Sequence, residues 1–228
     1  MQKNMERGTE VALGVLILIS CTSSILLSGR ASFGQLPSPS YQPRNEAFGI
    51  WGLIFPLLFI TSLYYLLSWK ANGAATIPFS ILLSSSLIFS SVWAGLVESR
   101  PALASFFLVI SYLFSVSTVC ILSFLPFSPS KFLFLSGPSL LAGWLTLAAP
   151  LSVSLSQIQA EWANSEWMLL PTSLVTLTVS SATSNPLVPI PILFGCALSR
   201  KSLASALLAT LSLSSSLFSL IYVVAKSH

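Results

Sequence analysis

The residue types that usually carry catalysis are scarce in this chain. Histidine occurs once, as the terminal His228, and aspartate does not occur at all. The three cysteines, Cys21, Cys120 and Cys196, lie inside apolar stretches without CxxC spacing, which is typical of small buried side chains. Serine is abundant, but neither a histidine nor an aspartate is available within the fold to activate it as a nucleophile. We therefore expect no catalytic residue, no metal site, no cofactor and no enzyme activity.

Aromatic side chains offer a different chemistry where the second apolar stretch begins. Residues 36–55 read LPSPSYQPRNEAFGIWGLIF, a proline-stiffened loop that leads into a helix. Four aromatic residues then share one helical face by three- and four-residue spacing: Phe48, Trp51, Phe55 and Phe59. Two interpretations stay open. The rings form either a packing stripe or one wall of a pocket for a flat conjugated ligand, because stacked rings hold planar molecules well.

The overall composition indicates a membrane protein. Charged residues make up 7% of the 228 residues, hydrophobic residues make up 54%, and the mean hydropathy is +0.86. An ordinary soluble protein has roughly 25% charged residues, and six acidic plus ten basic side chains cannot cover this chain with a polar shell. We expect an all-α integral membrane protein, with nearly all of the chain in the bilayer. The basic residues are scattered among the loops, so nucleic acid is not an expected partner.

Apolar stretches long enough to cross a bilayer recur along the chain, because about 20 helical residues span the hydrocarbon core. Six are predicted, over residues 9–28, 47–69, 77–97, 102–125, 132–155 and 202–225. The first is either a retained span, which we favour, or a cleaved signal peptide. Small residues recur on one face of the last span, and we expect this seam to pack against another helix. The seam consists of Ser205, Ala209, Ser212, Ser216 and Ser219.

The stretch 167–198 differs from the other apolar stretches because it combines four prolines with a polar centre around Ser184. As a single helix its 32 residues would extend about 48 Å, which is too long for one crossing. Two short helices that meet near Ser184 are therefore predicted. The total is eight crossings, or seven if this stretch crosses once.

The loop-to-helix segment resembles the translocator protein / tryptophan-rich sensory protein (TspO/MBR) family. In that family a Pro-Ser-Trp-x-Pro-Pro-Asn loop leads into a Phe-Gly-Pro-Val-Trp helix start. The matching residues here are Pro39, Ser40, Tyr41 in place of Trp, Pro43, Asn45, Phe48, Gly49 and Trp51. Two further segments agree, Ser91-Val92-Trp93 and Leu141-Ala142-Gly143-Trp144. The resemblance covers roughly residues 10–156 and looks like a longer branch of the family with extra C-terminal helices.

This resemblance implies a TspO-like five-helix bundle over residues 1–156, with two or three additional transmembrane helices over 157–228. It also implies binding of tetrapyrroles such as protoporphyrin, or of sterols. The positions that would contact such a ligand are Tyr41, Phe48, Trp51, Phe55, Ser90, Trp93, Trp144 and Ala148. Ser90 and Ser152 stand where the family has asparagines. Metal-free porphyrin is favoured over haem, because the only histidine is His228.

Three functions follow from these features. The leading one is a non-enzymatic membrane protein that binds a hydrophobic planar ligand for transport or sensing. The second is a small-solute transporter, because broken helices line the substrate sites of many transporters. The third is a membrane assembly factor. Membrane lipid and a hydrophobic small molecule are the expected partners, and a homodimer is left open, as is the identity of the membrane.

Overall fold

The computed structural model describes residues 2–28, 45–67, 76–123, 129–156, 169–197 and 203–226, and nearly all of them are helical. The first five α-helices are α1 (Gln2–Ser28), α2 (Trp51–Leu67), α3 (Thr76–Leu96), α4 (Pro101–Ser123) and α5 (Pro129–Ser156). A 3-10 helix, η2 (Asn45–Ile50), leads into α2. The remaining helices are α6 (Leu169–Thr183), α7 (Pro189–Ala197) and α8 (Leu203–Lys226). The predicted all-helical fold is confirmed.

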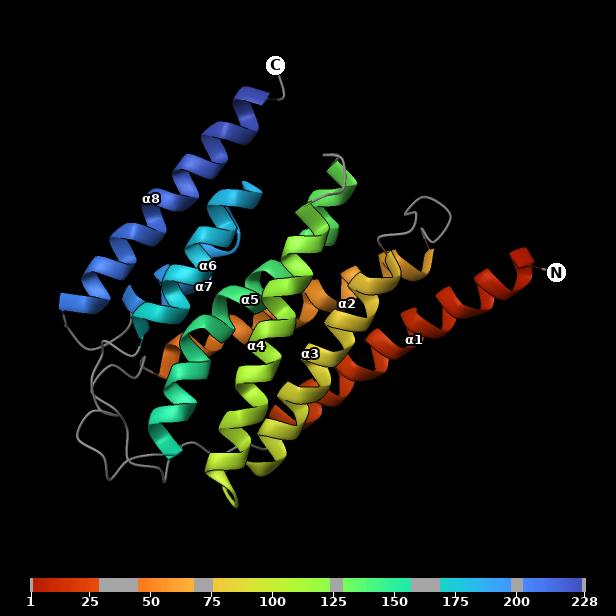
Figure 1. Cartoon of the computed structure of the whole chain (residues 1–228), viewed down its shortest axis with the longest axis horizontal. Coiled ribbons are helices and arrows are strands. Elements are labelled where there is room, and N and C mark those ends of the chain that lie inside the picture. The colour runs from red at the N-terminus through yellow and green to blue at the C-terminus, as the bar shows by residue number, and fades with distance from the viewer. Residues whose placement is uncertain are drawn as a thin grey trace.

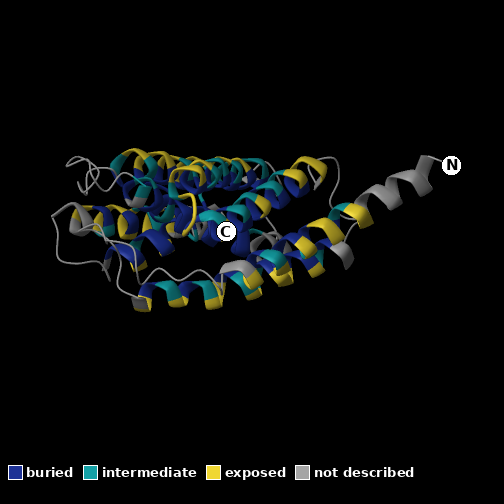
Figure 2. Cartoon of the chain, turned by 90° about the horizontal axis from the view of Figure 1, so that it is seen from below, coloured by how far each residue is buried: buried dark blue, intermediate teal, exposed yellow. Residues whose placement is uncertain are grey.

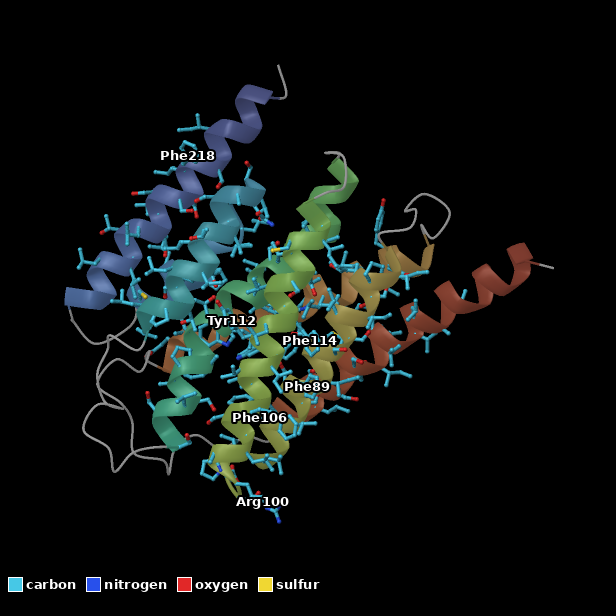
Figure 3. All side chains as sticks on the ribbon, viewed as in Figure 1. Phe89, Arg100, Phe106, Tyr112, Phe114 and Phe218 are labelled. Atoms are coloured by element: carbon cyan, nitrogen blue, oxygen red, sulfur yellow. The ribbon has the colours of Figure 1, made fainter. Side chains whose placement is uncertain are left out.

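The surface of the bundle is apolar, as a lipid-facing surface requires. Figure 2 shows exposed residues along the outer sides of the helices and buried residues toward the middle. Large apolar side chains stand on the outside, including Phe106, Phe218 and Ile221, which are 59%, 62% and 67% exposed (Figure 3). Among the residues that the structure describes, three helical segments are long and apolar enough to cross a membrane. They are Glu46–Tyr65, Ile77–Leu96 and Pro101–Leu122.

Helix α5 lies between two groups of helices, α1 to α4 and α6 to α8, and packs against members of both. Helix α3 packs against α1 and α4, and α5 packs against α4 and α2 on one side and against α6 and α7 on the other (Figure 1). One hydrophobic cluster fills the space among α1 to α5, with fully buried side chains such as Phe79, Leu83, Leu108 and Leu145. A second cluster lies between α5 and the last three helices, with Leu147, Leu151, Leu177, Ile192 and Leu208. Helix α5 therefore serves as a wall for both cores.

Hydroxyl groups join the helices inside these apolar cores. The Oγ atoms of Ser24 on α1 and Ser91 on α3 are 2.8 Å apart, and those of Ser90 on α3 and Ser111 on α4 are 2.7 Å apart. Lipid is as apolar as the helix surfaces, so burial alone gives helices little reason to associate. Small residues that allow close approach and bond across the interface supply part of that stabilisation.

Helix α6 runs antiparallel to α5. Near the start of α6, the Thr172 hydroxyl donates to the Thr146 carbonyl of α5 at 2.9 Å. Just beyond the end of α6, the Asn185 amide donates to Ser139 Oγ of α5 at 2.8 Å. The start of α6 thus lies beside residue 146 of α5 and its end beside residue 139, so the two helices run in opposite directions.

Helix α7 returns alongside α5 in the opposite sense. Pro191, near its start, lies against Gly143, and Gly195, near its end, lies against Leu147. Helices α6 and α7 consequently form a hairpin whose outer ends both lie toward the C-terminal end of α5. The chain reverses at Ser184, which has a φ of 52°, the left-handed conformation suited to a tight reversal. Two short helices that meet near Ser184 are confirmed.

The part of the small-residue seam of α8 whose side chains are described, from Ala209 to Ser219, faces inward as predicted; the side chain of Ser205 lies outside the described residues. Ser212 and Ser219 are fully buried, and the Ser216 hydroxyl donates to the Pro186 carbonyl in the α6–α7 turn at 3.2 Å. Helix α8 therefore passes directly behind the turn of the hairpin and covers it from outside.

Candidate functional site

Four of the predicted site residues form one aromatic cluster, in which two rings contact Trp144 and a third stacks on one of these two. The centroid of the Trp144 ring on α5 is 5.5 Å from that of Phe48 and 6.1 Å from that of Trp51, and both pairs meet edge to face at 78° and 76°. Trp51 in turn stacks on Phe55, with centroids 4.8 Å apart and planes tilted by 20°. Trp144 is 2% exposed, whereas the other three are half-buried. We name Phe48, Trp51, Phe55 and Trp144 the tryptophan cluster.

The local sequence explains why the aromatic stripe ends at Phe55. An α-helix turns about 100° per residue, so each four-residue step drifts about 40° around the axis. Phe59 follows Trp51 by two such steps and therefore points about 80° away from it. Its side chain is 41% exposed, on the outside of α2. The sequence placed all four rings on one face, but only the first three face α5.

Trp93, on α3, is hydrogen-bonded to a residue farther along α5. Its indole N–H donates to Ser152 Oγ at 3.0 Å, and the ring is 9% exposed. The Ser105 hydroxyl of α4 donates to the Ser152 carbonyl at 2.6 Å, so this point joins α3, α4 and α5. Ser152 follows Trp144 by eight residues, which is about 12 Å of helix. Trp93 and the tryptophan cluster thus lie two turns apart along the same helix.

The predicted polar position Ser90 bonds between helices. Its hydroxyl lies 2.7 Å from Ser111 Oγ on α4, and the residue is 6% exposed. Ser90 and Ser152, the two serines that replace the family's asparagines, therefore both use their hydroxyls in contacts between helices. Tyr41, predicted to cover the mouth of the site, lies outside the described residues.

Ala148 is the more accessible of the two predicted site residues on α5. It is half-buried, whereas the other residues from 136 to 152 are all buried. Its neighbours one turn away on the same helix face include Trp144, Leu145 and Ser152, at 2%, 0% and 3% exposure. Ala148 packs against the same core cluster as Trp51 and Phe55.

Sequence reasoning missed the contribution of α7. A Cβ atom placed on Gly195 would lie 3.7 Å from Cζ3 of Trp144, and it would overlap Cδ1 of Leu147. Helix α7 also contacts η2, which carries Phe48. A glycine inside a short apolar helix was the available sequence signal, since such a glycine often marks a close approach. In the part of the chain that the structure describes, no group of His, Cys, Asp or Glu could hold a metal ion.

Together, the helical bundle, its apolar outer surface and its buried aromatic cluster define a helical membrane protein. A family model described as TSPO-like protein matches residues 9–224, and the chain belongs to this family. The resemblance found in the loop and helix motifs is thereby confirmed. The matched region continues past residue 156 and includes α6, α7 and most of α8. A search of curated proteins and a search of solved structures found no match.

Proposed function

We propose that this TspO-like protein is a non-enzymatic, multi-pass membrane protein that binds a hydrophobic planar ligand for transport or sensing. The observation that carries the proposal is the tryptophan cluster, in which the half-buried rings of Phe48, Trp51 and Phe55 offer aromatic surface beside the buried Trp144. Flat conjugated ligands gain from offset stacking on such rings. A metal-free tetrapyrrole is the first ligand class to test, and a sterol-like molecule is the second.

The site favours a ligand held by shape and stacking over one held by specific polar contacts. The tryptophan cluster consists of rings alone, and the hydroxyls that follow Trp144 on α5 are already engaged: that of Thr146 lies 2.7 Å from Thr176 Oγ1, and that of Ser152 accepts the indole N–H of Trp93. Most ligand pockets are apolar with few polar groups, and those groups fix the orientation. Polar edge groups of a tetrapyrrole would then point toward an end of the bundle.

A direct test titrates the purified protein in detergent with protoporphyrin and follows the absorbance of the porphyrin itself. The readout stays valid when tryptophans are removed. Trp144→Ala and Trp51→Ala should each raise the Kd by about tenfold or more, because each removes an aromatic contact surface. Phe59→Ala, which removes an exposed ring from the same helix as Trp51, is the matched control and should leave the Kd unchanged. Equal affinities in all four proteins would refute the site.

We further propose that α1 to α5 and α8 cross the membrane, and that α6 and α7 form a re-entrant hairpin. Helix α6 has 15 residues and α7 has 9, which correspond to about 22 Å and about 14 Å. The hydrocarbon core is about 30 Å thick. The sequence predicts eight crossings, or seven if residues 167–198 cross once. Six and eight crossings both place the chain ends on one side, and seven would separate them. Reporter tags fused to each end therefore test for seven, and a reporter in the α6–α7 turn separates six from eight: end tags on opposite sides, or a turn accessible from the aqueous phase across the membrane, would overturn the six-crossing topology.

A small-solute transporter is the second candidate, because the hairpin turn lies beside the middle of α5. Broken helices that end inside the bilayer line substrate sites in many transporters. Reconstitution in liposomes separates the candidates. Tight ligand binding without flux supports a receptor, and ligand-dependent flux supports a transporter.

A further inference from the structure

Trp144 is confined from two sides, and one side belongs to the C-terminal hairpin. Phe48 and Trp51 meet the Trp144 ring edge to face. The backbone of α7 approaches the same ring at Gly195, where an added Cβ would lie 3.7 Å from Trp144 Cζ3. The ring at the centre of the proposed site is therefore held between the second helix of the bundle and α7.

The hairpin is fixed to α5 along its length, so α7 has little freedom to retreat from this ring. At the turn, the Asn185 amide donates to Ser139 Oγ at 2.8 Å. Midway along α6, the hydroxyls of Thr176 and Thr146 are 2.7 Å apart. All these side chains are buried, and buried hydrogen bonds are costly to break because the freed groups find no water.

A third anchor ties the hairpin to α4. The Tyr112 hydroxyl donates to the Thr172 carbonyl at 2.9 Å and lies 2.9 Å from Thr176 Oγ1. Figure 3 shows Tyr112 in the middle of the bundle, between α4 and the C-terminal helices. The hairpin is thus held by α4 and α5 through hydrogen bonds to α6 and to the turn, and α7 itself packs against α5.

We infer that α7 is a wall of the ligand site, and that Gly195 is a positioning residue that fixes the Trp144 ring and thereby sets the affinity for flat ligands. This inference rests on the proposed function. Leu147 is the intermediary, because it is 3% exposed, belongs to α5 and meets Gly195 directly. Any side chain at position 195 displaces Leu147 or α7, and in either case the packing around Trp144 changes.

The inference is tested with Gly195→Ala in the full chain, with two readouts. The first is the Kd for protoporphyrin. The second is the ¹⁹F resonance of Trp144 in protein labelled with fluorotryptophan, assigned by its loss in Trp144→Phe. Gly95→Ala on α3 is the matched control, because a Cβ there meets nothing within 4 Å and the position is exposed. Leu147→Ala combined with Gly195→Ala is the rescue variant, because it removes the overlapping methyl group.

Gly195→Ala should shift the Trp144 resonance and raise the Kd about tenfold, the double variant should restore both in part, and Gly95→Ala should change neither. An unchanged Kd in Gly195→Ala, together with lost binding in Trp144→Ala, would overturn the inference and leave the proposed function intact. An unmoved Trp144 resonance would also overturn it. Wild-type protein that binds no protoporphyrin would refute tetrapyrrole binding as the proposed function and, with it, the role of Gly195 in affinity for this ligand class.

Discussion

Replacing Gly143 by alanine should push the α6–α7 turn away from α5. A Cβ at this position would overlap the carbonyl oxygen of Val188 and would lie 2.9 Å from Cδ of Pro191. Neither atom belongs to a flexible side chain. The turn cannot step aside cheaply, because Asn185 ties it to Ser139 at 2.8 Å.

The expected loss of stability is the sum of three effects. Overpacking a filled core costs about 1–3 kcal/mol. Separation of Asn185 from Ser139 leaves buried polar groups without their partner, which costs about 1–3 kcal/mol. Alanine in place of glycine within a helix stabilises the folded protein by about 0.5–1 kcal/mol and offsets part of this loss. The free energy of unfolding of Gly143→Ala should therefore fall by about 1–5 kcal/mol, with a central value of about 3 kcal/mol.

The assay is reversible unfolding in mixed micelles with increasing SDS, followed by tryptophan fluorescence. Gly95→Ala makes the same chemical change in a helix where the new Cβ meets nothing. It should be neutral or should stabilise the protein by up to about 1 kcal/mol. Equal stability of the two variants would refute the reasoning, because it would mean that α7 and its turn do not press on α5 at Gly143.

Three further predictions use the same unfolding assay. Ser152→Ala should cost about 1–3 kcal/mol, because it leaves the buried indole N–H of Trp93 without its acceptor; no loss would contradict that bond. Tyr112→Phe should cost about 1–2 kcal/mol, because it removes the hydroxyl that clamps α6 to α4; full stability would show that the clamp is weak. Ser212→Ala should be neutral or stabilising, because the Ser212 hydroxyl is buried without a partner among the described residues; a loss above about 1 kcal/mol would reveal a partner.

The helix bounds were predictable because the bilayer imposes a length of about 20 apolar residues on each crossing. The predicted stretch 102–125, for example, corresponds to α4 at Pro101–Ser123. The break near Ser184 was predictable for a related reason, since a single helix there would have been too long for the membrane. Such limits act on the local sequence alone and need no knowledge of neighbouring helices.

The partners of each helix were less accessible to sequence reasoning. The spacing of the aromatic stripe placed Phe59 with Trp51 and Phe55, but the drift of the helix turned its ring to the outside. Ser90 and Ser152 were recognised as replacements for asparagine, but their bonds to Ser111 and Trp93 depend on which helices lie side by side. Contacts of this kind join residues that are far apart in the chain, and helical periodicity carries no information about them.

The sequence by itself determined that the chain is a helical membrane protein, that its helices fall where they do, and that its aromatic motif places it near TspO. It did so because apolar length, proline positions and a short motif are local properties. Only the tertiary structure decided that the last helices return to α5, that Gly195 lies against Trp144, and that Phe48 and Trp51 meet the same ring edge to face. These features depend on how closely backbones approach one another, which is settled when the helices pack together.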